Sequence, residues 1–330
     1  MWPRPMLIVR TPVRVSFCGG GTDLPAFYKN SDEGGLVTSM ALDAYIYVTV
    51  NKRFDNAVRV SYSQTENVDN FEDLQHELVR EAMRLTGVTS GIEITTIADI
   101  PGQGTGLGSS SSVTVGLLHA LHVYAGREVT AQQLAEEACH IEIGVLGQPI
   151  GKQDQYAAAY GGLNQIRFNS DESVDVIPLD SSTSSNLGEN FCLVWTGLTR
   201  KASSILEQQS RNTASKMQQL EAMRTQAEQV SGLIESGDFS AIGELLGNTW
   251  ELKRTLADGI SNPEIDTLYD QLMGLGCTGG KLLGAGGGGF ILVQTPPNVQ
   301  QKIATNLANK VIPLNPDLHG STLILDERGE

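Results

Sequence analysis

Glycine is concentrated in three short segments of this 330-residue chain, and this clustering limits the fold more than any other feature. The chain holds 36 glycines, against a usual share of about 7% of residues. Twelve of them lie in residues 19–21, 102–108 and 284–289. Because glycine tolerates positive φ and close backbone approach, the pattern predicts three tight loops rather than general flexibility.

Charge excludes several classes of partner. The formal net charge is −15, with 23 Lys and Arg against 38 Asp and Glu. Proteins that bind nucleic acid show a basic face, and this chain has no run of basic residues, so we expect no nucleic acid partner. The uncharged stretches 101–126 and 282–301 contain Gly, Ser, Pro or Gln, unlike a membrane span. We find no signal-peptide core and expect a cytoplasmic protein without a membrane partner.

Cysteine and histidine show no metal-binding pattern. The four cysteines are far apart and form no CxxC pair, so we expect reduced, buried thiols. His119 and His122 could share one helix face, but no third ligand lies nearby in the sequence. We interpret both as core or surface histidines.

Hydrophobic periodicity predicts alternating strands and helices. Helix signals include a cap at Thr130, whose helix would bury Leu134, Ala138, Ile141 and Val145, and the Asn262-Pro263 start of a helix ending at Gly276. Further helices are expected over 71–83, 113–124 and 217–230 and from Asn298. Strands are expected at 13–17, 45–50, 57–62, 92–97, 163–168, 174–177, 191–195 and 290–293.

A polar, serine-rich stretch over residues 179–190 is the best candidate for a domain boundary. We therefore predict two domains, residues 1–180 and 181–330. The hydrophobic periodicity by itself indicates only that the fold mixes α-helices and β-strands.

The middle glycine cluster has the character of a phosphate loop. It runs into a helix that begins with four serines, and the N–H groups of a first helical turn lack intrahelical partners. No GK[ST] sequence follows, so it is not a Walker A loop. Gly284, Gly286 and Gly289 match GxGxxG formally but precede a strand, which excludes a dinucleotide-binding fingerprint. A tight turn without a ligand is the alternative interpretation.

The segments VRVSFCGGGTD, PGQGTGLGSSSS and KLLGAGGGGF together resemble the three motifs of the GHMP small-molecule kinases. They occur in the family's order and span residues 13–290. Glu142, Pro149 and Asp154 also reproduce the spacing of a fourth segment in galactokinase-like members. The resemblance implies an α+β fold of two domains, an N-terminal α/β domain with a phosphate loop over its sheet and a C-terminal ferredoxin-like domain. The site would lie in the cleft between them.

The resemblance implies ATP and Mg²⁺ as cofactors. Asp154 would be the catalytic carboxylate, and Arg14 would keep it ionised; a surface Asp and an exposed strand Arg are the alternatives. Ser110 and Glu142 would bind the metal ion, unless Glu142 is a solvated helical residue. The residues expected to bind ATP are Gly102, Gly104, Thr105, Gly106, Leu107, Gly108, Ser109, Ser110 and Ser111.

The first motif bears on the acceptor. Gly20 and Gly21 stand where galactokinase has Glu and His, which leaves room for a larger sugar, and Asp23 matches a sugar-binding Asp. Arg200 and Lys201 could hold a substrate phosphate, although a surface pair at a helix start fits equally well. The full set expected to bind substrate is Gly20, Gly21, Thr22, Asp23, Gly151, Thr196, Arg200, Lys201, Gly286 and Gly287.

Three segments are most similar to the branch of bacterial D-glycero-D-manno-heptose 7-phosphate kinases: GGGTD, WTGLTR and DQYAAAYGG. This implies phosphorylation of that sugar phosphate to the 1,7-bisphosphate, a step toward nucleotide-activated heptose and surface glycans. A kinase for fucose, galactose or a uronic acid, and a non-catalytic sensor of nucleotide and sugar, remain open. The oligomeric state also remains open, and the protein could be a monomer or a homodimer.

Overall fold

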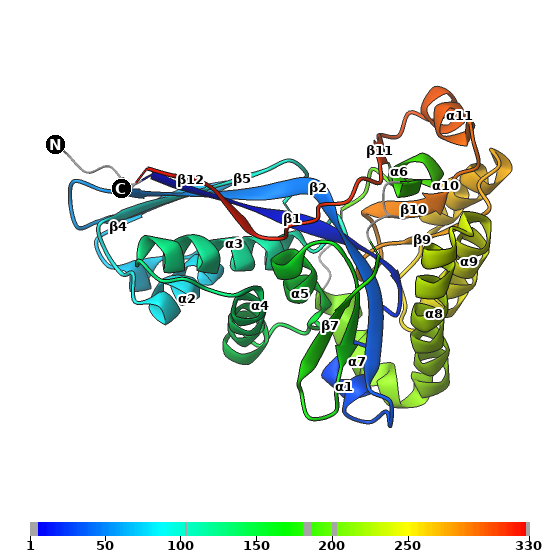
Figure 1. Cartoon of the computed structure of the whole chain (residues 1–330), viewed down its shortest axis with the longest axis horizontal. Helices are drawn as coiled ribbons and strands as arrows, with labels where there is room; N and C mark the ends of the chain where they lie inside the picture. The colour runs from blue at the N-terminus through cyan, green and yellow to red at the C-terminus, as the bar shows by residue number, and fades with distance from the viewer. Residues whose placement is uncertain (1–5, 103, 181–185, 200–202, 328–330) are drawn as a thin grey trace.

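The first sheet contains both the first and the last strand of the chain. The computed structural model describes residues 6–102, 104–180, 186–199 and 203–327. Strands follow the order β12-β1-β2-β5-β3-β4, and β6 joins β2 to β7. The strands are β1 (Met6–Cys18), β2 (Gly35–Lys52), β3 (Val58–Ser61), β4 (Thr65–Val68), β5 (Ile92–Ala98), β6 (Leu163–Phe168), β7 (Val174–Pro178) and β12 (Thr322–Asp326). Strand β2 is long and bends between its two sets of partners (Figure 1).

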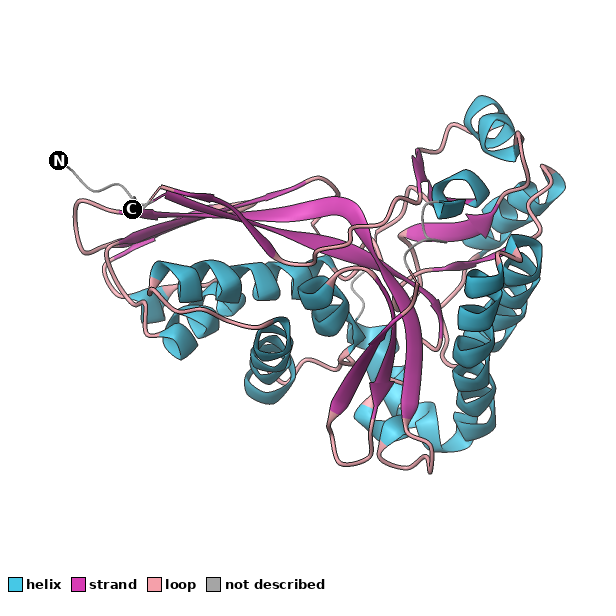
Figure 2. Ribbon diagram, viewed as in Figure 1, coloured by secondary structure: helices cyan, strands magenta, loops and turns pink. Residues whose placement is uncertain are grey.

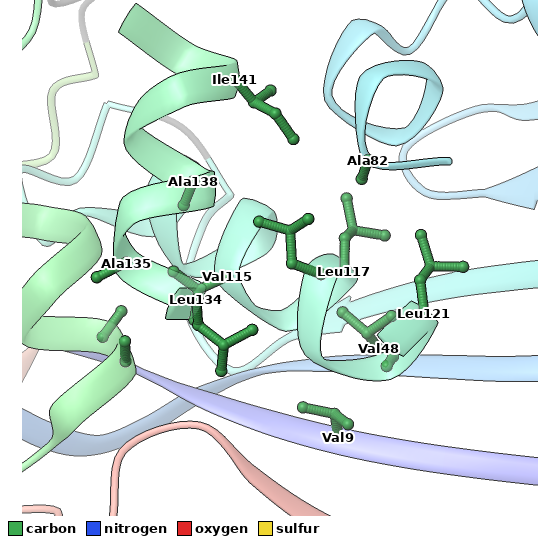
Figure 3. Packing of buried hydrophobic residues seen from close by; sticks show 14 of the residues in the cluster. Val9, Val48, Ala82, Val115, Leu117, Leu121, Leu134, Ala135, Ala138 and Ile141 are labelled. Carbon is green, nitrogen blue, oxygen red and sulfur yellow. The ribbon is translucent and has the colours of Figure 1, made fainter. Parts of the chain in front are cut away.

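Four helices cover one face of this sheet (Figure 2). They are α2 (Glu77–Thr86), α3 (Ser109–Tyr124), α4 (Ala131–Cys139) and α5 (Gln153–Tyr160). Helix α3 has buried residues around most of its surface, because it lies between the sheet and the other helices. Val115, Leu117 and Leu121 of α3 pack with Val9 and Val48 of the sheet (Figure 3). This packing fixes the N-terminus of α3 relative to β1.

The second sheet has the strand order of a ferredoxin-like domain. Strands β8 (Phe191–Trp195), β9 (Gly279–Leu282), β10 (Phe290–Gln294) and β11 (Val311–Pro313) pair antiparallel as β11-β8-β10-β9. This arrangement confirms the predicted fold class. The helices of this half are α6 (Leu187–Asn190), α7 (Ser203–Asn212), α8 (Met217–Ser236), α9 (Phe239–Arg254), α10 (Pro263–Gly274) and α11 (Val299–Asn306).

A continuous hydrophobic core joins the two halves. Val13 and Phe17 of β1 and Met40 of β2 belong to the same buried cluster as Phe191 of β8 and Leu246 of α9. Helix α8 packs against β1, β2 and α9 (Figure 1). The predicted boundary begins at residues 181–185, which lie outside the described residues, whereas β12 pairs with β1 in the first sheet.

The predicted strands and helices occur, with two differences. The helix expected over 71–83 is divided: a 3₁₀ turn covers Phe71–Asp73, Leu74 is extended, and α2 begins only at Glu77. Thr130 caps α4 by accepting a hydrogen bond from the backbone N–H of Gln133 at 3.1 Å. However, α4 ends at Cys139, and η2 (His140–Val145) is a π-helix. The wider π turn changes which side chains face inward. Glu142 is therefore fully buried, whereas Val145, predicted to be in the core, is 49% exposed.

The remaining sequence expectations concern thiols, histidines and membrane spans. All four cysteines are free and buried, as predicted. His119 Nδ1 contacts Ser321 Oγ at 2.9 Å, and His122 Nε2 contacts Glu137 Oε2 at 2.6 Å, so each ring has its own partner. Within the described residues, no helix combines the length and apolar character that crossing a membrane requires.

Candidate active site

The middle glycine cluster forms the loop before α3, as the sequence predicts. Gly104, Gly106 and Gly108 all have positive φ, which side-chain-bearing residues rarely adopt. Gly108 is the N-cap of α3 and supplies no side-chain cap. The first-turn N–H groups of Ser109, Ser110 and Ser111 therefore have no intrahelical partners and carry the positive end of the helix dipole. Such a terminus binds a phosphate group without basic side chains.

The third glycine cluster supports this loop from behind. Phe290 N donates to Thr105 O at 3.1 Å. A Cβ added at Gly106 would lie 2.6 Å from Leu283 O, and one at Gly289 would lie 2.3 Å from Thr105 O. Contacts this short exclude any side chain at either position. The second and third motifs therefore pack backbone against backbone and hold each other in place.

An ion pair joins the loop to the first motif and to α5. Arg14, on β1, is 4% exposed, and its Nε donates to Asp154 Oδ1 at 2.8 Å. A second guanidinium nitrogen donates to the same oxygen at 2.5 Å, and a third donates to Gly106 O at 2.6 Å. Asp154 lies in the first turn of α5 and keeps a quarter of its side chain exposed. Its other oxygen, Oδ2, faces Gly108.

A second carboxylate lies close by in the first motif. Asp23 is 3% exposed and accepts hydrogen bonds from Gly21 N at 2.9 Å and Gln153 Nε2 at 3.0 Å. Burial raises the pKa of Asp23, and the charge of Asp154 raises it further. A Cβ at Gly151 would lie only 1.9 Å from Asp23 Oδ2. Glycine at 151 is thus required for Asp23 to occupy this position.

The structure brings Ser110 and Glu142 together. Ser110 Oγ donates to Glu142 Oε1 at 3.2 Å, and Gln155 Nε2 donates to Oε2 at 2.6 Å. Burial raises the pKa of Glu142 to about 7, opposed by hydrogen bonds from Gln155 and Ser111. A buried carboxylate beside an exposed serine at the phosphate loop suits Mg²⁺, which takes one or two carboxylates and otherwise water and substrate phosphates. The described residues contain no cluster of three or more metal-ligating His, Cys, Asp or Glu.

These groups surround one cavity of about 610 Å³ between the two halves of the molecule. Among the predicted residues, Thr22, Leu107, Thr196 and Gly287 do not line it. Arg200 and Lys201 lie outside the described residues, and Glu142 lies behind Ser110. The predicted residues that line the cavity are Arg14, Gly20, Gly21, Asp23, Gly102, Gly104, Thr105, Gly106, Gly108, Ser109, Ser110, Ser111, Gly151, Asp154 and Gly286.

The predicted residues outside the cavity wall have structural contacts instead. Thr22 Oγ1 donates to Gly19 O at 2.7 Å and closes the first-motif turn. Thr196 N donates to Gly289 O at 3.0 Å, and Gly287 N donates to Ile260 O at 2.9 Å. Leu107 is part of the shared hydrophobic core. These residues shape the glycine loops from outside the cavity.

Gln153, Lys253 and Lys281 are among the polar residues of the cavity wall that sequence reasoning missed; the others are Ser16, Gln148, Thr199, Ser203 and Gln209. Gln153 holds Asp23, as described above. Lys281 stands at the start of the KLLGAGGGGF segment and could have been noticed there. Lys253 lies in the last turn of α9, where a lysine is ordinary for a helix, so the sequence carries no signal for it.

Comparisons with known proteins agree with this architecture. Residues 74–162 match the sequence model of the GHMP kinases N terminal domain, and residues 230–312 match that of GHMP kinases C terminal. The D-glycero-alpha-D-manno-heptose 7-phosphate kinase of Campylobacter jejuni is 29% identical over 87% of this chain and 89% of its own length. The L-fucokinase/L-fucose-1-P guanylyltransferase of Bacteroides fragilis is 27% identical over 97% of this chain, which spans only 38% of that protein.

Solved structures share the fold. A D-glycero-D-manno-heptose 1-phosphate kinase from Bacteroides thetaiotaomicron matches with a TM-score of 0.79 and 23% identity, over 97% of this chain and 99% of its own. The galactokinase of Lactococcus lactis, solved with galactose, matches with a TM-score of 0.75 and 17% identity, over 96% and 95% of the two chains. The two family models, one of which includes the phosphate loop, place the chain among the small-molecule kinases. The chain belongs to the GHMP kinase family, as an ATP-dependent sugar kinase.

Proposed function

We propose that this kinase transfers the γ-phosphoryl group of ATP to D-glycero-D-manno-heptose 7-phosphate and forms the 1,7-bisphosphate. The observation that carries the chemistry is the Arg14–Asp154 pair, held at 2.8 Å on the cavity wall beside the phosphate loop. Arg14 occupies Oδ1 of Asp154, while Oδ2 accepts no hydrogen bond from the part of the chain that the structure describes and can receive a sugar hydroxyl. A carboxylate fixed in this way can orient the attacking hydroxyl.

The proposed reaction is a direct displacement at phosphorus. The C1 hydroxyl oxygen of the sugar forms a bond to the γ-phosphorus, while the bond from that phosphorus to the β,γ-bridging oxygen breaks and ADP leaves. Asp154 Oδ2 accepts the hydroxyl proton. The N–H groups of Ser109, Ser110 and Ser111 stabilise negative charge on the phosphoryl oxygens, as preorganised donors do in such sites.

The residues present fit a Mg²⁺ ion, and we propose Ser110 and Glu142 as its protein ligands. Glu142 is a fully buried carboxylate without a cationic partner among the described residues. A divalent ion would supply the missing positive charge and neutralise charge on the ATP phosphates. Gln155 would keep Glu142 oriented toward Ser110, because its amide already donates to the other carboxylate oxygen.

The identity of the sugar rests on similarity to the C. jejuni heptose 7-phosphate kinase and on the space in the first motif. A Cβ added at Gly20 would meet nothing closer than 3.9 Å. The side chains of Asp23 and Gln153 lie next to this space. A seven-carbon sugar with a phosphate needs more room than galactose, which favours the heptose. We keep Arg200 and Lys201 as candidates for its phosphate, and expect the product to serve nucleotide-activated heptose synthesis in the cytoplasm.

A panel of acceptors tests the proposal. ADP release is measured with heptose 7-phosphate, unphosphorylated heptose, L-fucose, galactose and glucuronic acid at fixed ATP and Mg²⁺. We expect the highest kcat/KM with heptose 7-phosphate. Higher kcat/KM with L-fucose would assign the enzyme to the fucokinase-like branch of the family. Absence of ADP release with every sugar would contradict the catalytic proposal and favour the sensor.

A further inference from the structure

Two buried lysines lie at the wall of the active-site cavity, and the chemistry proposed above assigns no role to either of them. Lys253, at the end of α9, is 6% exposed, and Lys281, on β9, is 1% exposed. Burying an ammonium group is costly unless an opposite charge compensates for it. Within the described residues, neither lysine forms an ion pair with a carboxylate.

The lysine ammonium groups instead hold the backbone of two glycine motifs. Lys253 Nζ donates to Leu282 O at 2.9 Å and to Gly284 O at 2.5 Å, which fixes the start of the third motif. Lys281 Nζ donates to Phe17 O at 2.9 Å, next to the glycines of the first motif. Backbone carbonyls satisfy the N–H donors but do not neutralise the charge. Burial therefore disfavours the charged form of both side chains.

Several titratable groups surround the two lysines. Among the described residues, burial and then the charges of Lys281 and Arg14 lower the pKa of Lys253, and the charge of Asp23 raises it. Burial and the charge of Arg14 lower the pKa of Lys281, and Cys18 raises it. Tyr269 of α10 also contacts this strand, since its hydroxyl donates to Gly280 O at 3.2 Å. Arg14 is already paired with Asp154. An anion bound in the cavity would therefore favour the charged form of both lysines.

We propose that Lys253 and Lys281 are positioning residues that hold the first and third glycine motifs at the cavity and give its wall the positive charge against which phosphate-bearing reactants bind. This inference deepens the proposed function, because it rests on the cavity being the site where ATP and a sugar phosphate meet. The lysines need not touch the phosphate groups directly, because an anion in the cavity stabilises the charged form of both side chains.

Proton uptake on binding follows from this arrangement. Burial lowers the pKa of Lys281 to about 8 and that of Lys253 well below its usual range. In the free enzyme at pH 8.5, Lys281 is therefore largely uncharged. A bound phosphate raises the pKa of a nearby lysine, so binding takes up a proton from solution. At this pH the phosphates of the ligands are already ionised and exchange few protons.

Calorimetry in two buffers of different ionisation enthalpy measures that uptake. Wild-type enzyme is titrated at pH 8.5 with ATP and Mg²⁺ without acceptor, and separately with heptose 7-phosphate without nucleotide. We expect uptake of about half a proton or more per bound molecule for at least one ligand. Uptake with neither ligand would overturn the proposal. Failure of the sugar panel leaves the ATP titration informative, so the two proposals fail separately.

Four variants separate charge from structure. Lys281→Met and Lys253→Met should lose about tenfold in affinity for the ligand that drives uptake, with reduced uptake. Lys281→Arg keeps its charge at pH 8.5 and should keep affinity while its share of the uptake disappears. Lys302→Met, at an exposed lysine of α11, should match wild type. Wild-type affinity in both buried Lys→Met variants would contradict the inference, and circular dichroism checks that each variant is folded.

Discussion

Asp154 and Asp23 are two carboxylates of one cavity with different electrostatic surroundings. Arg14 supplies Asp154 with a positive charge at 2.8 Å, whereas Asp23 receives only neutral hydrogen-bond donors. The sequence predicted Arg14, Asp23 and Asp154 as site residues because each lies in a motif. It gave no indication of Gln153 as the partner of Asp23, because that contact depends on how α5 meets the first-motif turn.

Asp154→Asn tests the proposed proton acceptor. An amide can still accept a hydrogen bond from Arg14, but it cannot take a proton from the sugar hydroxyl. We expect kcat to fall by about 10²- to 10⁴-fold, with little change in thermal unfolding temperature. Asp171→Asn, in the exposed turn between β6 and β7, is the matched control and should leave kcat unchanged. A loss of kcat below about tenfold in Asp154→Asn would remove Asp154 from the mechanism.

Gly151→Ala tests whether Asp23 must occupy its observed position. The added methyl group would lie 1.9 Å from Asp23 Oδ2, so the carboxylate must move. We expect KM for the sugar to rise about tenfold or more while KM for ATP changes little. Gly274→Ala is the control, because a Cβ at that position in α10 would meet nothing within 4 Å. An unchanged sugar KM in Gly151→Ala would show that Asp23 does not contact the acceptor.

At the level of elements, α4 and η2 show where periodicity alone was insufficient. The spacing of Leu134, Ala138 and Ile141 predicted one α-helix to Val145, and the first three positions are buried. A π turn after Cys139 has no signature in hydrophobic spacing, because it depends on the inward turn of Glu142 toward Ser110 and Gln155. The departure from the predicted helix thus coincides with a proposed functional residue.

Acid should weaken the contact between α3 and the segment before β12 through His119. Burial, and then the charge of His122, lower the pKa of His119 to about 4. Because the folded pKa lies below the unfolded value of about 6.5, the stabilisation is complete above pH 6.5 and is lost toward pH 4. We expect wild type to lose up to about 2 kcal/mol of unfolding free energy between pH 6.5 and 4.5 from this group.

Urea unfolding of His119→Gln at both pH values isolates this contribution. The neutral amide can still contact Ser321 but does not titrate. The variant should therefore lose less unfolding free energy than wild type over the same pH interval. His76→Gln is a useful comparison, since burial also lowers the pKa of His76, the N-cap residue of α2. Equal pH dependence in wild type and His119→Gln would contradict a buried neutral His119.

At the scale of the whole molecule, the three glycine clusters meet at one cavity although they lie far apart in the sequence. The resemblance to a kinase family predicted this convergence, but composition and periodicity could not, since it depends on the core shared by both halves. The position of β12 beside β1 was also invisible in the sequence, because a short apolar strand carries no information about its partner. Long-range pairing is a property of packing rather than of local pattern.

Net charge of the whole molecule should influence how ATP and a sugar phosphate reach the cavity. The chain carries a formal charge of −15, so it repels anionic substrates at distances where exposed charges act, and salt screens this repulsion. The buried guanidinium of Arg14 and the N-terminus of α3 act at short range and are screened less, and so do Lys253 and Lys281 once a bound anion favours their charged form. We expect kcat/KM for ATP to rise about two- to threefold from about 20 to 200 mM KCl at fixed free Mg²⁺. Lys302→Glu, which adds negative charge far from the cavity, should make kcat/KM for ATP rise more steeply with KCl. A fall of kcat/KM by more than about threefold in wild type would show that exposed cations govern binding.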